Sequence, residues 1–308
     1  MKTIYQRVPH YQMLPCAMFL ILLAALLPYS TLAQLPSSSV YLVPFPSEAV
    51  EQKPHTTMEY LLASDFNPGG YNHQPFFADK NTLLLSSGQH EQTDLVQLDL
   101  ENIEKKRLTA TEESEFSPGI NPRNGYLSFV RMEEDGVQRL WTAPADLSNN
   151  GSPVTPLHLK VGYYQWLRGN LIALYLLRED HHEIIVWNSY SGEEKFLTKK
   201  PGRSLQSDQL GRLYYVIKKN ENVRHIYRYD PTTQNSQLLV RMPTAGSEDF
   251  CLGPDGILLN AVDNVIMGFR PDIDSSWQPI LTLQGMENQR ITRLASNGVD
   301  YLCFVVEH

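Results

Sequence analysis

Six short clusters of polar and aromatic residues recur along the sequence, and their side chains are of types that bind ligands. With one anchor residue taken in each cluster, the successive spacings are 42, 49, 40, 45 and 42 residues. The clusters cover residues 70–74, 113–117, 162–166, 202–206, 246–250 and 288–292. Amide, guanidinium and phenol groups of this kind could hold a polar ligand, whereas the carboxylates together with a histidine could hold a divalent cation.

No set of catalytic residues accompanies these clusters. The sequence contains no Gly-x-Ser-x-Gly nucleophile motif. His181, His182 and Glu183 are a dense group of metal-ligand types, but they lie between two apolar runs, where a solvated turn is expected. Adjacent residues of a strand also point to opposite faces. The sequence therefore predicts no catalytic residue.

Apolar runs between the clusters predict the elements that position them. The runs are five to seven residues long and are bounded by Gly, Pro, Asp or Asn turns, which fits strands buried on both faces better than helices. They cover residues 82–86, 126–130, 171–177, 213–217, 257–261 and 301–306. A further strand follows each of the first five runs, at 94–98, 139–143, 184–188, 226–229 and 265–269. A mean repeat of about 44 residues is the length of a four-stranded propeller blade.

The sixth repeat stops after its second strand, which would leave an exposed sheet edge. Residues 40–45 resemble the third strands of the other repeats, and residues 58–63 resemble the outer strands. We therefore expect the N-terminal segment to complete the last blade, with two strands from each end of the chain. The predicted fold is all-β: one six-bladed β-propeller of four-stranded antiparallel blades, over residues 34–308.

The strand and turn pattern also carries a family resemblance. Two stretches resemble the TolB-type, WD-repeat-like six-bladed propellers of exported bacterial proteins. They are GYNHQPFFADKNTLLLSS followed by TDLVQLDL, and ESEFSPGINPRNGYLSFVR followed by QRLWTAPAD. The resemblance covers nearly all of residues 40–308. The typical Ser-Pro-Asp-Gly turn survives best at 253–256, as GPDG. Because these motifs are turns and strands, the resemblance implies the propeller fold. It does not imply the cellular role of TolB.

In a propeller the first strand of each blade is innermost, so the loop that enters it lies at the mouth of the central channel. This geometry predicts a ligand site at the mouth. Its candidate residues are Asn72, His73, Gln74, Glu113, Glu115, Tyr163, Tyr164, Gln165, Arg203, Gln206, Glu248, Asp249 and Arg290. The alternative is that these groups bond neighbouring blades and ordered water. No cofactor or metal is predicted, although a divalent cation in the channel, bound by Glu115, Glu248, Asp249 and His73, stays open.

The charge balance of the sequence limits the kinds of partner that the protein can bind. The chain has 26 Lys and Arg against 34 Asp and Glu, a formal net charge of −8. An acidic protein of this kind offers no electrostatic basis for binding a phosphate backbone, so nucleic acid is excluded as a partner. We expect a monomer that binds an unidentified protein or small molecule.

Residues 1–33 have the layout of a secretory signal peptide. Lys2 and Arg7 precede an apolar run over residues 17–27, and Thr31-Leu32-Ala33 supplies a cleavage site of small residues. The apolar segment is shorter than the roughly 20 residues that span a bilayer. We therefore expect cleavage after Ala33, export to the periplasm or beyond, and no transmembrane span in the mature chain. Two cysteines then remain, Cys251 and Cys303, which could form one bridge or be two buried apolar thiols.

Together these features predict an exported, non-catalytic binding or scaffolding module that holds a protein segment or small ligand at its channel mouth. The alternative is a hydrolase of the lactonase or esterase type that uses a channel-bound divalent cation.

Overall fold

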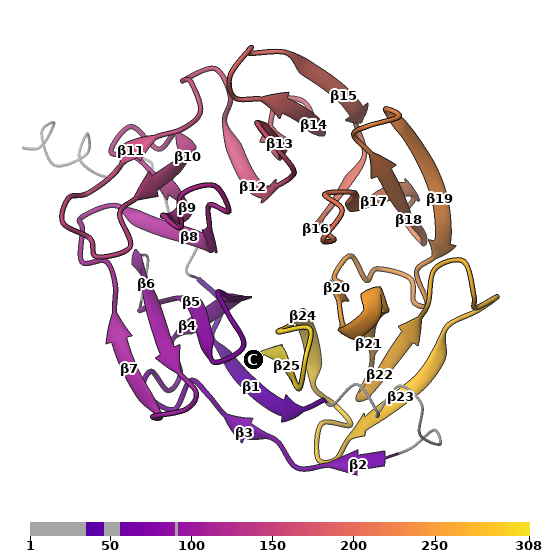
Figure 1. The fold of residues 1–308 in the computed structure, drawn as a ribbon. Helices are drawn as coiled ribbons and strands as arrows, with labels where there is room; N and C mark the ends of the chain where they lie inside the picture. Colours follow the sequence, from indigo (N-terminus) through magenta and orange to yellow (C-terminus); the bar gives the residue numbers. More distant parts are fainter. Residues whose placement is uncertain (1–34, 46–55, 90–91) are drawn as a thin grey trace, which may run out of the picture. The chain divides into compact units, whose positions relative to one another are not determined.

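The structure is a computed structural model that describes residues 35–45, 56–89 and 92–308. The strands of these residues form six sheets that are arranged radially around a ring (Figure 1). Within the described residues the only helical segment is a single 3₁₀ turn, Pro254–Gly256. The predicted all-β, six-bladed propeller is therefore confirmed.

Each blade starts at the centre of the ring. The innermost strands are β4 (Tyr71–Phe77), β8 (Ser114–Ile120), β12 (Val161–Trp166), β16 (Pro201–Ser207), β20 (Cys251–Leu252) and β24 (Arg290–Ser296). The second strands are β5 (Thr82–Gln89), β9 (Leu127–Met132), β13 (Leu171–Leu177), β17 (Leu213–Asn220), β21 (Leu258–Val262) and β25 (Tyr301–Glu307). All six second strands coincide, within three residues at either end, with the apolar runs of the sequence.

The third and fourth strands lie towards the outside of the ring. The third strands are β6 (Gln92–Asp99), β10 (Gln138–Ala143), β14 (His182–Asn188), β18 (Val223–Asp230), β22 (Val265–Phe269) and β1 (Ser38–Pro44). The outer strands are β7 (Glu104–Arg107), β11 (Ser152–Pro153), β15 (Glu194–Thr198), β19 (Asn235–Arg241), β23 (Gln278–Leu283) and β3 (Leu61–Leu62). A further strand, β2 (Thr56–Met58), pairs in parallel with β23.

The last blade is built from both ends of the chain, in the order β24-β25-β1-β3. Strand β1 pairs with β25 over seven residue pairs, from Ser38 opposite Glu307 to Pro44 opposite Tyr301. The predicted closure is thus correct, with one refinement. Residues 58–63 do not form one strand: β3 alone is the outer strand, while Met58 ends β2 on the neighbouring blade.

The hydrophobic core is divided into six clusters, one at each interface between adjacent blades. The second strands contribute from both of their faces: Leu83 and Leu85 pack towards the last blade, whereas Leu84 packs towards the second blade. Burial on both faces explains why these strands are continuous apolar runs instead of alternating ones. The centre of the ring is left to the first strands and their polar side chains.

The first strands are irregular at the positions that face this centre. The register with the second strand shifts between His73 and Phe76 in β4 and between Phe116 and Gly119 in β8. It also shifts in β12, β16 and β24. In the first two blades the irregularity includes a left-handed residue followed by proline, Gln74 (φ 54°) and Ser117 (φ 51°). Bulges of this kind redirect side chains, and here they direct polar groups into the channel.

Three further predictions concern the signal peptide, membrane-spanning segments and the two cysteines. The proposed signal peptide, residues 1–33, lies outside the described residues. In the part of the chain that the structure describes, no helix has the length and hydrophobicity needed to cross a membrane. Cys251 and Cys303 are both buried and unbridged, and burial raises the pKa of each thiol. They therefore act as small apolar core residues.

Ring closure predicts that the aromatic contact between the two chain ends is a large contributor to stability. Phe304 on β25 is fully buried and stacks on Tyr41 of β1, with ring centroids 5.2 Å apart. Phe304→Ala should lower the free energy of unfolding by about 3–5 kcal/mol, measured by urea denaturation. Phe196→Ala is the matched control, because that side chain is 49% exposed on β15; its effect should stay within about 1 kcal/mol. Equal losses in the two variants would contradict this account.

Candidate functional site

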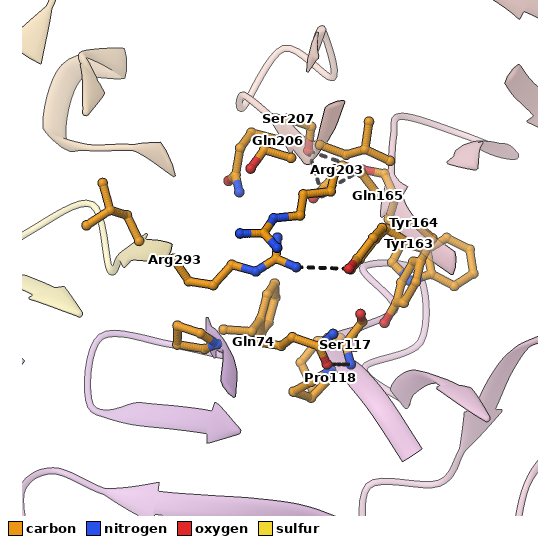
Figure 2. Close-up of a pocket in the computed structure, with 18 of the residues that line it drawn as sticks. Gln74, Ser117, Pro118, Tyr163, Tyr164, Gln165, Arg203, Gln206, Ser207 and Arg293 are labelled. Atoms are coloured by element: carbon orange, nitrogen blue, oxygen red, sulfur yellow. Dashed lines mark hydrogen bonds between the residues drawn. The ribbon is translucent and has the colours of Figure 1, made fainter. Parts of the chain in front are cut away.

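A cavity of about 310 Å³ lies at the centre of the ring, and residues from all six blades line it. Its polar lining includes two arginines, and none of the described residues that line it is acidic. Figure 2 shows the guanidinium groups of Arg203 and Arg293 beside one another in this cavity, facing Tyr163. The volume is at the lower end of the range for small-molecule sites, about 300–1,000 Å³.

Asp249 holds the two arginines together from outside the cavity lining. Arg203 donates to Asp249 through Nε (3.0 Å to Oδ1) and Nη2 (2.5 Å to Oδ2), and Arg293 donates through Nη1 (3.0 Å to Oδ1). Burial disfavours the charged form of Arg203, but the Asp249 carboxylate outweighs it and raises the pKa of the guanidinium. The three side chains, from three different blades, carry a net charge of +1.

Arg293 is positioned by an aromatic neighbour as well. Its Nη2 donates to the Tyr163 hydroxyl at 3.0 Å, and its guanidinium lies 5.0 Å from the centre of the Tyr163 ring. The Tyr163 ring is fixed in turn by an edge contact with Tyr175. Arg293 Nε is buried and has no hydrogen-bond partner among the described residues.

The opposite wall is formed by the bulged strands β4 and β8. Gln74 Oε1 accepts the backbone N–H of Ser117 at 2.7 Å and the Ser86 hydroxyl at 3.0 Å, which ties the first blade to the second. The Ser117 Oγ atom is buried without a partner in the described part of the chain. This wall therefore contains a buried hydroxyl oxygen without a partner in the described residues.

Tyr164 and Trp166 provide the apolar side. Both donate to the Ser128 hydroxyl, at 2.8 and 3.0 Å, so their rings are locked in place. Gly119 is required beside them, since a Cβ at that position would lie 2.7 Å from the Tyr164 hydroxyl. Burial raises the pKa of Tyr164, so this phenol is neutral at physiological pH and acts as a hydrogen-bond donor.

The structure brings six of the sequence-predicted residues into the cavity lining and leaves seven out. The lining includes Gln74, Tyr163, Tyr164, Gln165, Arg203 and Gln206. The Gln206 amide forms no hydrogen bond with any described residue, so both of its polar atoms are available. The residues that do not line the cavity are Asn72, His73, Glu113, Glu115, Glu248, Asp249 and Arg290.

Two of the excluded residues connect strands and blades. Asn72 is 1% exposed and donates to the backbone oxygens of Ser38 and Asn67, which ties β4 to β1 of the last blade. Glu115 is fully buried, 3.2 Å from Arg131, and accepts hydrogen bonds from Thr109 and Thr111. Burial raises the pKa of Glu115 although these donors oppose the shift.

His73, Glu307 and Arg290 form a separate chain of contacts. The His73 Nε2 atom lies 3.4 Å from Glu307, and Arg290, whose side chain is 76% exposed, lies 3.1 Å from the same carboxylate. Burial, with the nearby arginines, lowers the pKa of His73 below its usual 6.5. A neutral imidazole that donates its Nε2 proton to Glu307 fits these contacts and leaves Nδ1 as the unpaired acceptor.

The carboxylates that the sequence offered as cation ligands do not converge. Glu248 accepts from Lys218 at 2.6 Å, Glu115 faces Arg131, and Asp249 faces the two arginines of the cavity. Among the residues that the structure describes, no three His, Cys, Asp or Glu side chains are grouped as a metal site would require. The residues present therefore do not fit the divalent cation of a lactonase-type site.

Sequence reasoning missed Arg293. The candidate residue from the sixth cluster was Arg290, three residues earlier, but the register of β24 shifts between Ile291 and Arg293. The shift leaves Arg290 exposed and brings Arg293 to the cavity. A basic residue next to a cluster was visible in the sequence, but nothing in a single strand predicts the position of a bulge.

The shared carboxylate predicts a large loss of stability when its charge is removed. Asp249→Asn keeps the shape of the side chain but leaves two mostly buried guanidiniums facing each other, so it should cost about 3–5 kcal/mol in the free energy of unfolding, measured by urea denaturation. Asp272→Asn removes a carboxylate that is 62% exposed and paired with Arg228, and should cost less than about 1 kcal/mol. If both variants are equally stable, Asp249 does not hold the arginines.

The Glu307 contacts predict a specific pH dependence. The hydrogen bond from His73, opposed by burial and supported by Arg290, lowers the pKa of Glu307 from 4.5 to about 2. Because the folded-state pKa is depressed, the stabilisation is complete above pH 4.5 and is lost as the pH falls towards 2. Unfolding free energy measured from pH 6 to 3 should therefore fall more steeply for the wild type than for Glu307→Gln. Glu221→Gln, on the exposed β17–β18 turn, is the control, and identical slopes for all three proteins would refute the assignment.

Comparison with known proteins gives structural matches only. No family model and no curated protein matches the sequence. Among solved structures, a protein designated TolB from Agrobacterium tumefaciens has a TM-score of 0.59 at 13% identity, over 89% of this chain and 99% of that one. TolB from Acinetobacter baumannii has a TM-score of 0.55 at 12% identity, over 87% of this chain but only 63% of its own length.

A protein designated a gluconolactonase is also similar, with a TM-score of 0.57 at 10% identity, over 86% of this chain and 97% of that one. At these identities the matches concern the fold and not the chemistry of the site. The chain therefore shares the six-bladed propeller fold of TolB proteins, as its strand and turn pattern indicated.

Proposed function

We propose that this protein is an exported, non-catalytic binding module whose central cavity holds a small ligand or the end of a partner's peptide segment. One observation carries the proposal. The cavity lining contains two buried polar atoms without partners in the described structure, Ser117 Oγ and Arg293 Nε, and the half-buried Gln206, beside rigid aromatic walls. A buried polar group that is left unpaired costs free energy, so a ligand that pairs with it gains affinity.

The titratable groups near the channel support binding over catalysis. The carboxylates Glu115, Glu248 and Asp249 are all engaged by arginine or lysine, so none is free as a base or nucleophile. Preformed walls also favour binding, because a rigid site loses little entropy when it is occupied. Export rests on the signal-peptide pattern of residues 1–33, and we propose a periplasmic monomer.

The competing function is hydrolysis of a lactone or ester. It is favoured by the fold shared with the protein designated a gluconolactonase. The carboxylates near the channel count against hydrolysis, because they do not converge on a single cation site.

Filling the cavity should separate specific from non-specific binding. Gln206→Trp places an indole in the cavity, whereas Gln209→Trp makes the same change at an exposed turn after β16. In a thermal-shift screen of small molecules and short peptides, cavity ligands should stabilise the wild type and Gln209→Trp but not Gln206→Trp. A ligand at 100 times its Kd adds about 2.7 kcal/mol to the unfolding free energy. Ligands that stabilise all three proteins equally would bind elsewhere and count against the proposal.

A direct test addresses the hydrolase alternative. The wild type and Gln206→Trp are incubated with a panel of lactones and esters, with and without a chelator. We expect no turnover above the uncatalysed rate. Turnover that is lost both on chelation and in Gln206→Trp would replace the binding function with hydrolysis.

A further inference from the structure

The charges around the cavity are unbalanced. Arg203 and Arg293 line it, and the carboxylate that contacts both of them, Asp249, lies outside the lining. Glu248 accepts a hydrogen bond from the Arg203 backbone N–H, and its charge is paired with Lys218 and Arg224. Arg203, Asp249 and Arg293 therefore leave one positive charge uncompensated at the cavity, on arginine side chains that are 29% and 11% exposed.

The two arginines also have donors to spare. Arg203 uses Nε and Nη2 for Asp249 and the Thr292 carbonyl oxygen, and Nη1 takes part in none of these bonds. Arg293 uses Nη1 and Nη2, while its buried Nε is unpartnered in the described structure. Planar guanidinium donors match the two oxygens of a carboxylate.

The remainder of the lining limits the body of the ligand. Tyr163, Trp166 and Phe76 supply aromatic surface around a volume of about 310 Å³. Such a space suits a small aromatic or aliphatic group. The single excess charge matches a monoanion, whereas a phosphate monoester would bring a second, unpaired negative charge.

We propose that the cavity binds a monocarboxylate through Arg203 and Arg293, with the apolar part of the ligand against Tyr163, Trp166 and Phe76. This inference rests on the proposed binding function and names the chemistry of the ligand. The carboxylate can belong to a free organic acid or to the C-terminus of a peptide. Asp249 fixes the two guanidiniums in advance, so the anion meets a prearranged site.

The first experiment compares an acid with its own amide on the unaltered protein. Phenylacetate and phenylacetamide have nearly the same shape and differ in charge, so calorimetry at low salt should give at least tenfold weaker binding for the amide. Raising the salt concentration should weaken binding of the acid only. Equal affinity of acid and amide, or no saturation by the acid at about 10 mM, overturns the proposal.

A second pair of probes identifies the source of the carboxylate. N-acetyl-Gly-Gly-Phe with a free C-terminus is compared with its C-terminal amide. Tighter binding of the peptide acid than of phenylacetate supports a peptide C-terminus, and the reverse order supports a free organic acid. With either source, the acid must bind more tightly than its own amide. If it does not, the role of the arginines is refuted.

Matched variants on one strand locate the charge. Arg293→Gln should weaken phenylacetate binding at least tenfold, and Arg290→Gln, an exposed arginine on the same strand β24, should change it less than twofold. Should Arg293→Gln fail to fold, the acid–amide comparison still decides, because it uses the wild type. Equal effects of the two variants would overturn the assignment.

The experiments distinguish a failure of the carboxylate proposal from a failure of the proposed binding function. If acid and amide bind equally and Gln206→Trp abolishes both, the cavity binds ligands but not through the arginines. If no ligand in any screen depends on Gln206, both proposals fall.

Discussion

The closure of the ring by strand β1 is the interaction on which the rest of the structure depends. Seven residue pairs join β1 to β25, and β3 completes the blade from the N-terminal side. Because the core consists of six interface clusters, each blade is stable only when both of its neighbours are present. The central cavity has the same requirement, since every blade contributes to its lining. Ring closure therefore determines both the stability of the propeller and the existence of a site.

Polar residues near the channel are divided between two tasks. Those at the start of the first strands, such as Asn72 and Glu115, are buried and connect strands and blades. Those at and after the bulges, such as Gln74, Ser117 and Arg293, reach the cavity. The bulge separates the two tasks because it reverses the direction of the side chains that follow it. Residues of the same chemical type, a few positions apart, thus hold the fold in one case and line the site in the other.

The arginine pair shows how the fold and the site share one carboxylate. Asp249 joins Arg203 of the fourth blade to Arg293 of the sixth, so an ionic contact crosses three blades at the centre of the ring. An isolated buried carboxylate would be costly, but here two guanidiniums and the Ser204 hydroxyl surround it. The positive charge that remains is what the cavity offers to a ligand. Removing one partner of such a pair is costly because it leaves the other charge buried and uncompensated.

The sequence by itself determined the repeat, the all-β class, the number of blades and the closure by the N-terminal segment. These features depend on local patterns: apolar runs for strands buried on both faces, turn residues at regular intervals, and two strands missing at the end of the last repeat. Tertiary structure decided which polar residues form the site. Arg293 and Arg290 are three residues apart, and Gln74 and Asn72 two apart, yet in each pair only one lines the cavity. The position of a bulge, and the neighbouring blade that supplies a partner such as Asp249, depend on contacts between residues more than 40 positions apart, which no single strand encodes.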